Sequence, residues 1–274
     1  MMLGKLFLHK WLVMRRITQL SIFLLFLLGP VAQLWILKGN LSSSLLLNKI
    51  PLNDPFILLQ SLVAGHNPLL QAWIGAAIVL VFYLLVGGRV YCSWVCPVNI
   101  LTDAATWLHK KLGLRPRRAP SRNLRYWLLA VILFSSAATG SIVWELVNPV
   151  SMLHRGLIFG IGLGWLIVFG VFIYELLITP HGWCGHICPV GAFYGLLGKF
   201  SLLRVSAAKR EQCNDCAECF IVCPEPQVIR PALKGSGTPV VMAGACTNCA
   251  RCIDVCSENV FNFTHRFDHR KEIS

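Results

Sequence analysis

The sequence predicts an all-α membrane domain of four transmembrane helices in two parallel repeats, followed by a small α+β domain. Three observations support this fold class. Hydrophobic residues make up 55% of the 274 residues and charged residues only 14%, a composition typical of membrane proteins. Four long apolar segments lie in the first two thirds of the chain, and eight of the 12 cysteines lie in one run near its end. We therefore expect a membrane domain at residues 1–204 and a second domain at residues 205–274.

The four apolar segments are each long enough to cross the roughly 30 Å hydrocarbon layer of a bilayer as a helix. We expect these helices at about residues 17–37, 69–88, 126–144 and 157–179. The first segment has a longer apolar run than a typical signal peptide and lacks a small-residue cleavage site. It is therefore expected to stay in the protein as a membrane anchor.

The net charge of +13 comes entirely from the region upstream of residue 205. Residues 205–274 contain eight basic and eight acidic residues, whereas the upstream region contains 17 basic and four acidic residues. The upstream basic residues lie beside apolar segments and form no basic face with stacking aromatic residues. We therefore relate the charge to membrane topology and expect no binding of nucleic acid.

The distribution of basic residues predicts the orientation in the membrane, because cytoplasmic connections are enriched in Lys and Arg. Twelve basic residues precede the first segment or lie between the second and third, and the connections on the opposite side have only Lys38, Lys49 and Arg155. The N-terminus, the middle connection and the C-terminal domain are therefore expected on the cytoplasmic side of a bacterial inner membrane. The twelve are Lys5, Lys10, Arg15, Arg16, Arg89, Lys110, Lys111, Arg115, Arg117, Arg118, Arg122 and Arg125.

The two halves of the membrane domain are similar in sequence. Residues 54–59, which begin Asp-Pro, resemble residues 148–153, which begin Asn-Pro and lie 94 positions later. Residues 91–98 resemble residues 183–190, 92 positions later, and both contain Cys-x3-Cys-Pro. Each half therefore has a span, an outer turn, a second span and a cysteine motif at the cytoplasmic end. Because each half crosses twice, we expect parallel repeats related by an axis along the membrane normal.

The repeat is expected to bring the four cysteines of these motifs, Cys92, Cys96, Cys184 and Cys188, to the same depth. At positions i and i+4 the two thiols of a motif share one face of a helix. Three interpretations remain open: a further iron–sulfur cluster held by four thiolates, a pair of redox-active dithiols, or packing of small thiols. A closed set of four ligands around a two-fold axis favours the first.

The C-terminal cysteines form two copies of the spacing Cys-x2-Cys-x2-Cys-x3-Cys. Bacterial ferredoxins use this spacing for two [4Fe–4S] clusters, and the fourth cysteine of each copy binds the other cluster. Four-thiolate zinc sites are the alternative, but they usually use separated Cys-x2-Cys pairs. The spacing therefore predicts a ferredoxin-like domain with two clusters. The expected ligands are Cys213, Cys216, Cys219 and Cys256 for the first cluster, and Cys246, Cys249, Cys252 and Cys223 for the second.

Glu175 lies inside the fourth apolar segment near its cytoplasmic end. An ionisable group in a membrane span is costly and by default indicates a functional site, here a proton acceptor for a quinol. The alternative is that Glu175 reaches the interface or pairs with a basic residue. His66, Glu145 and His154 near the outer ends are weaker candidates for a quinol site, because solvated loop residues explain each of them.

Several sequence features exclude other chemistry. The chain has no Cys-x2-Cys-His for covalent haem, no histidine in the middle of a span and no Walker A motif. We therefore expect no reaction beyond electron and proton transfer.

The combination of motifs resembles the NapH family, the membrane ferredoxin-type subunits of the periplasmic nitrate reductase system. The resemblance rests on residues 92–97, 148–151, 181–192 and 213–216, and it covers almost the whole chain. It implies a quinol dehydrogenase that passes electrons from the membrane quinone pool, with a NapG-type ferredoxin partner outside the cytoplasm, toward periplasmic nitrate reductase. It also implies that the eight C-terminal cysteines bind clusters, and it leaves the content of the two upstream motifs open.

Two other classes are compatible with parts of the pattern. Polyferredoxins with the same spans act as metal reductases or assembly factors, but they carry a further C-terminal domain, and only 18 residues follow Cys256 here. Thiol-based redox regulators of related systems carry a large outer flavin domain, for which the outer segments here are too short. Both classes are therefore less favoured.

The expected mechanism starts with a quinol that releases two electrons and two protons, which single-electron carriers separate. The predicted topology places the clusters in the cytoplasm and the partner outside it. Electrons must therefore recross the membrane or feed another branch. A cofactor at the four upstream cysteines would provide the recrossing step.

Overall fold

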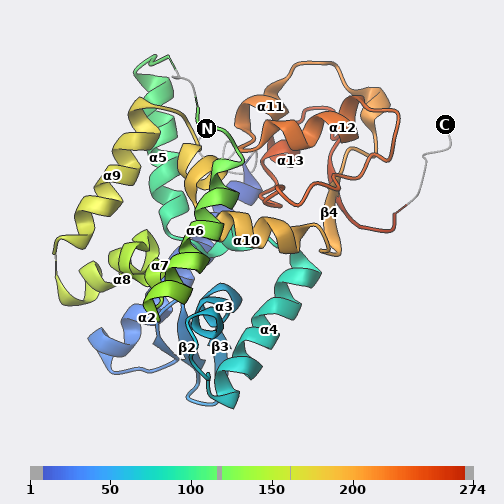
Figure 1. The fold of residues 1–274 in the computed structure, drawn as a ribbon. Helices are drawn as coiled ribbons and strands as arrows, with labels where there is room; N and C mark the ends of the chain where they lie inside the picture. Colours follow the sequence, from blue (N-terminus) through green and yellow to red (C-terminus); the bar gives the residue numbers. More distant parts are fainter. Residues whose placement is uncertain (1–8, 116–118, 161, 269–274) are drawn as a thin grey trace. The chain divides into compact units, whose positions relative to one another are not determined.

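The computed structural model describes residues 9–115, 119–160 and 162–268, and the chain divides into two compact units (Figure 1). The first unit consists of Met1–Thr18, Tyr83–Val95 and Tyr194–Ser274, and the second of Gln19–Phe82 and Cys96–Phe193. Lys5, Arg117 and Arg118, which contribute to the predicted orientation, lie outside the described residues. The first unit contains the C-terminal cysteine run together with residues 83–95, and the boundary at residue 205 stays a prediction.

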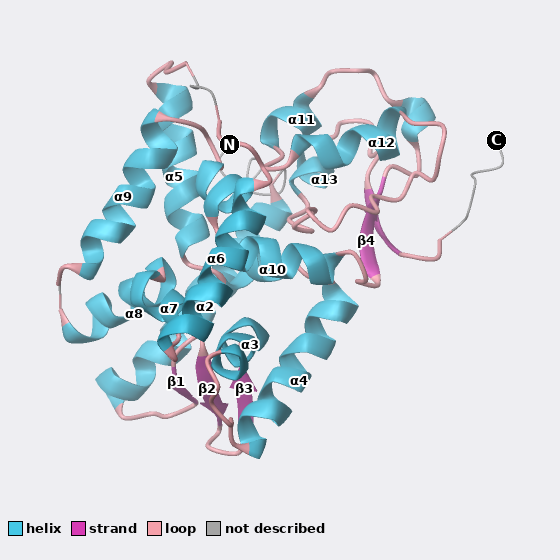
Figure 2. Cartoon of the chain, in the orientation of Figure 1, coloured by secondary structure: helices cyan, strands magenta, loops and turns pink. Residues whose placement is uncertain are grey.

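Each predicted apolar segment contains a helix (Figure 2). Among the described residues, one helix, α2 (Lys10–Ala32), is both long enough and apolar enough to cross a membrane. The other three are apolar but have only 17, 16 and 14 residues. They are α4 (Leu70–Val86), α6 (Leu124–Thr139) and α9 (Gly164–Leu177).

The fourth apolar segment is interrupted, although the sequence predicted a single helix over residues 157–179. Helix α8 (Pro149–Phe159) ends at Gly160, and α9 begins four residues later. Gly160 has a φ of 93°, which is outside the helical region and is accessible mainly to glycine. This glycine therefore separates the two helices.

The Asp-Pro and Asn-Pro sequences of the repeat start helices in the same way. The side chain of Asp54 accepts a hydrogen bond from Phe56 N (2.9 Å) at the start of α3 (Pro55–Val63). The side chain of Asn148 accepts one from Val150 N (3.1 Å) at the start of α8. In both copies proline takes the first helical position, where its missing N–H costs nothing.

The connection after α2 forms a three-stranded antiparallel sheet, so the prediction of an all-α membrane domain is wrong here. The strands β1 (Leu37–Gly39), β2 (Ser43–Leu46) and β3 (Ile50–Asn53) lie in that order (Figure 2). The Asn40 side chain accepts bonds from Ser42 N and Ser43 N, both at 2.9 Å, and closes the first turn. The hydropathy pattern gave no indication of these short strands.

The remaining helices of the second unit are α5 (Val98–Lys111), α7 (Val143–Val147) and the first part of α10 (Pro189–Gly198). Helix α5 packs along α9, and the His109 ring nitrogen Nδ1 lies 2.7 Å from the Leu176 carbonyl oxygen. Helix α7 is one short turn between α6 and α8. Helix α10 follows the second motif and contains the boundary between the two units.

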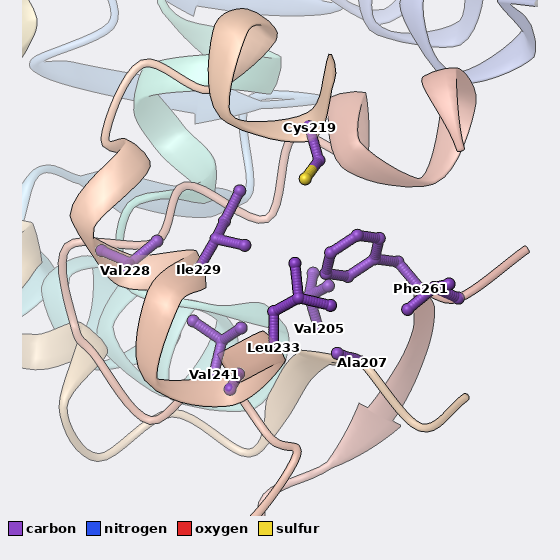
Figure 3. Close-up of a cluster of buried hydrophobic side chains, with 10 residues drawn as sticks. Val205, Ala207, Cys219, Val228, Ile229, Leu233, Val241 and Phe261 are labelled. Atoms are coloured by element: carbon purple, nitrogen blue, oxygen red, sulfur yellow. The ribbon is translucent and has the colours of Figure 1, made fainter. Parts of the chain in front are cut away.

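The C-terminal region builds a small α+β core (Figures 1 and 3). Strand β4 (Leu203–Ser206) pairs antiparallel with β5 (Asn262–His265), and Leu203 is opposite His265. The short helices are α11 (Glu218–Val222), α12 (Ile229–Lys234) and α13 (Arg251–Val255), with 3₁₀ turns at Arg210–Gln212 and Pro226–Val228. Their apolar side chains form one buried cluster, and Figure 3 shows the Cys219 sulfur directed toward it.

The matched helix starts generate a stability prediction. Replacing Asp54 by Ala removes the acceptor for Phe56 N and is expected to lower the free energy of unfolding by about 1 kcal/mol. Asp54→Asn keeps an acceptor of the kind that Asn148 provides in the other copy, so it is expected to lose much less. Thermal unfolding in detergent compares the two variants, and an equal loss for both would contradict a capping role.

Candidate iron–sulfur centres

The C-terminal core contains a cavity, here called the first cavity, that is lined by four cysteines. They are Cys213, Cys216, Cys219 and Cys256. Cys216 is exposed and Cys219 is buried, so one side of the cavity faces solvent. Three lining cysteines come from the first run and one from the second.

The other four cysteines of the C-terminal runs line a second, smaller cavity. They are Cys223, Cys246, Cys249 and Cys252. Here three cysteines come from the second run and one from the first. The cavities thus group the cysteines in the same way as the predicted ligand sets, and the assignment of a cluster to each set stays a prediction. Phe261 lines both cavities.

A repeated backbone conformation explains this grouping. Asp215 and Ala217 in the first run have φ values of 60° and 61°, and Asn248 and Ala250 in the second have 46° and 59°. These left-handed residues turn the chain sharply at equivalent positions of the two runs, and a short helix follows each turn. Helices α11 and α13 pack against each other, so the cysteine after each helix lies in the cavity of the other run.

The thiols of the second cavity lie in surroundings that disfavour an isolated thiolate. Burial raises the pKa of Cys246 to about 11, while Arg204 and Arg89 act in the opposite direction. Burial also raises the pKa of Cys223 and Cys252, and neighbouring thiols add to the effect. Cationic iron would favour the thiolate over the protonated thiol, because metal binding stabilises thiolates and releases their protons. Four soft sulfur ligands around each cavity therefore fit an iron–sulfur cluster.

The two cavities differ in the charges around them. Asp215, Glu218 and Glu258 line the first cavity together with Lys234, whose ammonium group pairs with Asp215. Glu225 and Arg251 line the second cavity. The buried arginines Arg89 and Arg204 add positive charge near Cys246.

Within the described part of the chain, no three His, Cys, Asp or Glu side chains converge closely enough to hold a single metal ion.

Both Cys-x3-Cys motifs adopt a π-helical turn, which the sequence did not predict. The turns are Tyr91–Val95 and Trp183–Ile187, and each is followed by proline and an α-helix. In the second motif Cys188 N donates to Trp183 O at 2.9 Å, a bond that spans five residues. The α-helical face expected for each pair is therefore replaced by a wider turn. Single π-turns are rare and occur frequently at functional sites.

Side chains beside the first motif bind the loop that carries the second run of cysteines. Ser93 Oγ donates to the Thr247 carbonyl at 2.8 Å, and Trp94 Nε1 donates to the Asn248 carbonyl at 3.1 Å. Arg89 Nη1 donates to the Ala245 carbonyl at 2.9 Å. These three carbonyl groups belong to the residues before and after Cys246, so the hydrogen bonds connect the first motif to the loop that lines the second cavity.

The second motif is supported by Glu175, the predicted proton acceptor. This side chain is fully buried, and its two carboxylate oxygens accept hydrogen bonds from Gly182 N (3.1 Å) and Trp183 N (2.9 Å). Arg125 Nη1 donates to the Gly185 carbonyl at 3.2 Å inside the same turn. Glu175 therefore holds the start of the π-turn that carries Cys184. Its role as a proton acceptor stays a prediction.

The four upstream cysteines are divided between the two compact units. Cys92 belongs to the first unit, and the other three belong to the second. Within the second unit, Cys96 and Trp183 pack against the same cluster of buried valines from α5, α8 and α9. The end of the first motif therefore lies beside the residue that precedes Cys184. A common four-thiolate site stays a prediction.

Glu145, His154 and His66, the weaker candidates for a quinol site, were expected to be solvated loop residues. Glu145 accepts hydrogen bonds from Ser151 Oγ (2.6 Å), Asn148 Nδ2 (3.4 Å) and Ser42 Oγ. His154 is buried, and its ring meets Phe26 edge-on at 5.6 Å. His154 is therefore not a solvated loop residue, whereas Glu145 is half-buried and hydrogen-bonded, and His66 is exposed.

Sequence reasoning missed the residues that attach the first motif to the cysteine loop. Arg89 had been counted only as a cytoplasmic charge, and Ser93 and Trp94 only as members of a repeated motif. Their partners lie 154 to 156 positions away in the sequence, and no spacing rule connects them. A signal does exist in the difference between the copies, since Gly185 and His186 replace Ser93 and Trp94 in the second motif.

A family model described as a 4Fe-4S binding domain matches the chain twice, at residues 69–115 and 161–207. The two matches begin 92 positions apart, which confirms the internal repeat. Each contains one Cys-x3-Cys-Pro motif, and both end before the C-terminal cysteine run. No solved structure matches the chain.

Several curated proteins are similar over almost the whole chain. The methylamine utilization ferredoxin-type protein MauN of Methylorubrum extorquens is 54% identical over 263 residues, which cover 96% of this chain and 92% of that protein. The ferredoxin-type protein NapH of Escherichia coli is 49% identical over 260 residues, which cover 94% and 91%. NapH of Haemophilus influenzae is also 49% identical, over 96% of this chain and 93% of that protein. The chain therefore belongs to the family of ferredoxin-type electron-transport proteins that includes NapH and MauN.

Proposed function

We propose that this protein is a membrane electron-transfer subunit that oxidises quinol and passes the electrons through iron–sulfur clusters to a ferredoxin-type partner. The observation that carries the proposal is the pair of cavities, each lined by four cysteines in the crossed pattern of a two-cluster ferredoxin. Two clusters near each other form a path for single electrons. The chain supplies their ligands and excludes water from the more buried site.

The proposed membrane location is supported by apolar side chains that face outward on the helices. Leu163 is 84% exposed, Phe134 76% and Leu69 78%, and further large apolar residues are exposed along α2, α4, α6 and α9. Large exposed apolar side chains on several helices support a contact with a membrane or a partner. Trp35, Trp73 and Trp127 lie near helix ends, where interfacial aromatic residues occur. We propose that all four apolar segments enter the membrane and that the N-terminus and the cluster domain lie in the cytoplasm.

The lengths of the shorter apolar helices limit how these segments can cross the membrane. Helices of 17, 16 and 14 residues are only about 25, 24 and 21 Å long, so adjoining turns must complete each crossing. Helix α8 directly precedes α9 and α7 directly follows α6. Polar groups in these connections are paired, as with Glu145 and its three donors, which reduces the cost of placing them at a membrane surface.

The chemistry of the proposed reaction is the separation of two electrons from two protons. When bound, each cluster supplies a carrier that accepts one electron with little rearrangement. The side chain proposed to take a proton is Glu175, which is buried next to the second motif. Cys92, Cys96, Cys184 and Cys188 are proposed to hold a further cluster or to act as dithiols, and the family match over both motifs supports the cluster.

The destination of the electrons has two candidates. The similarity to NapH supports a NapG-type ferredoxin partner and the periplasmic nitrate reductase chain. The similarity to MauN, which is slightly higher at 54% identity, supports an equivalent role in methylamine utilization. Both candidates share the quinone pool and the clusters, and they differ only in the partner protein. Reduction of each purified partner by quinol and this protein distinguishes them.

The first prediction concerns the metal content of protein purified without oxygen. Two [4Fe–4S] clusters give about eight iron and eight sulfide per chain, and a further cluster gives more. Iron and acid-labile sulfide analysis with electron paramagnetic resonance measures these numbers. Zinc without sulfide would overturn the proposed function.

Single cysteine substitutions are expected to remove one cluster at a time. Cys249→Ser removes a buried ligand of the second cavity, and Cys216→Ser removes an exposed ligand of the first, so each should lower the iron content by about four per chain. The resonance signals lost by the two variants should differ. Cys184→Ser is the control, because it leaves both C-terminal sets intact, and its iron content reports on the upstream motifs.

A third prediction tests the role of Glu175. Glu175→Gln preserves size and one acceptor atom but cannot take up a proton, so quinol oxidation is expected to slow at least about 100-fold. Iron content should stay unchanged. Gln19→Leu is a matched control, since Gln19 Nε2 donates to the Cys96 carbonyl at 3.3 Å and carries no ionisable group. Oxidation at the normal rate in Glu175→Gln, with a normal pH dependence, rules out a proton acceptor at this position.

A further inference from the structure

Six consecutive residues beside and within the first motif, 89–94, bind the loop of the second cavity at three points. Arg89, Ser93 and Trp94 donate to the backbone carbonyl groups of Ala245, Thr247 and Asn248, at 2.9, 2.8 and 3.1 Å. Arg89 and Ser93 are 1% and 2% exposed, so water does not compete for these bonds. Among the described residues that line the first cavity, none comes from 83–95.

We propose that the second cluster, held by Cys223, Cys246, Cys249 and Cys252, is the one that exchanges electrons with the first Cys-x3-Cys motif. Arg89, Ser93 and Trp94 are the positioning residues that join the two. This inference rests on the proposed function and adds the order of the carriers to it. The first cluster, whose cavity has no lining residue from 83–95, then exchanges electrons with the motif only through the second cluster.

Close backbone contacts make the attachment rigid. A Cβ atom on Gly88 would lie 2.3 Å from Tyr194 O and from Gly198 N, and one on Gly198 would lie 2.6 Å from Gly244 O. Only glycine permits such distances. The chain before the first motif, the end of α10 and the loop before Cys246 are therefore packed backbone against backbone. The distance between the first motif and the second cluster is therefore fixed, and electron transfer depends on this distance.

Trp94 is fixed from two sides. Its indole N–H is bonded to Asn248, and its ring meets the ring of Trp11 edge-on at 6.2 Å. Trp11 N in turn donates to Asp254 Oδ1 at 3.3 Å, on the helix that carries Cys252. The Trp94 ring therefore cannot turn away without breaking contacts on both sides.

The second positioning element is electrostatic. Arg89 Nη1 lies 2.6 Å from Glu225 Oε1, and both side chains are only 1% exposed. Glu225 lines the second cavity two residues after Cys223. A fixed positive charge close to a cluster favours its reduced form, which carries one more negative charge, and a fixed negative charge disfavours it. Arg89 and Glu225 thus act on the second cluster in opposite directions.

The proposed step transfers one electron and no atoms. With both sites loaded, an iron–sulfur group held by the first motif would give up the one electron that a cluster held by Cys223, Cys246, Cys249 and Cys252 would gain. The electron comes from quinol, whose two protons are released within the membrane domain. No bond forms or breaks between the motif and the cluster.

A series of charge substitutions tests the electrostatic part. Arg89→Gln is expected to shift the equilibrium for reduction of the second cluster about tenfold toward the oxidised form, which is about 59 mV for one electron. Glu225→Gln is expected to shift it in the opposite direction. The double variant removes both charges and should lie between the two. Redox titration followed by electron paramagnetic resonance measures both clusters, and the first should not move in any variant.

The double variant also provides a measurement if the single variants misfold. A single substitution leaves one buried charge without its partner and can destabilise the chain strongly, whereas the double variant leaves none. Iron content and unfolding temperature are recorded for all three. Equal shifts of both clusters, or no shift of the second in a folded variant, would overturn the assignment.

Substitutions at the hydrogen bonds test the order of carriers. Trp94→Phe and Ser93→Ala remove the bonds to the cysteine loop but no charge, so the potential of the second cluster should stay close to normal. Its reduction by quinol in a single turnover should slow at least tenfold. The matched control is Trp107→Phe, an exposed residue of α5 whose ring lies under the Lys111 ammonium group. Normal reduction of the second cluster in Trp94→Phe, or slowing only of the first, would refute the proposed order.

The redox titration and the reduction by quinol can fail independently of each other. Titration uses a chemical reductant, so the shifts in potential are measurable even if quinol is not the donor. If quinol never reduces the normal protein, the proposed function is wrong. If quinol reduces it normally and Arg89→Gln moves the wrong cluster, only the inference fails.

Discussion

The buried ion pair between Arg89 and Glu225 is the interaction on which the arrangement of the first unit depends. The two groups are 2.6 Å apart, and each is almost inaccessible to water. Removing either partner leaves a buried charge, which is costly, so the two segments that carry them must stay together. One segment leads into the first Cys-x3-Cys motif, and the other follows Cys223. The geometry of the second cavity is therefore tied to the motif by charge and by hydrogen bonds.

The protein uses duplicated local structures at two scales. Over about 90 positions, both halves repeat a capped helix start and a π-helical cysteine turn. Over 33 positions, both cysteine runs repeat a left-handed turn and a short helix. The copies differ in what supports them, because Glu175 holds the second π-turn whereas Ser93 and Trp94 attach the first to the cysteine loop. Similar backbones thus acquire different roles from their surroundings.

The second unit buries several polar side chains and exposes large apolar ones. In the second unit, Gln60 is fully buried and its Oε1 accepts bonds from Trp144 N (3.1 Å) and Ser136 Oγ (3.3 Å). Large apolar side chains such as Phe134, by contrast, face outward. This arrangement fits the membrane location proposed above, because lipid provides no hydrogen-bond partners and polar groups then pair between neighbouring helices.

The sequence by itself determined the features that depend on local spacing. Cysteine intervals defined two sets of four, and the same sets line the two cavities; hydropathy located the apolar helices, and the repeat was visible in the two motifs. The tertiary structure alone decided the break at Gly160, the sheet after α2, the π-turns and the partners of Glu175 and Arg89. Each of these depends on a single backbone angle, a shifted hydrogen bond or a contact between distant residues. These features produce no repeating pattern in the sequence, because their energy comes from contacts in the folded protein and not from the residue itself.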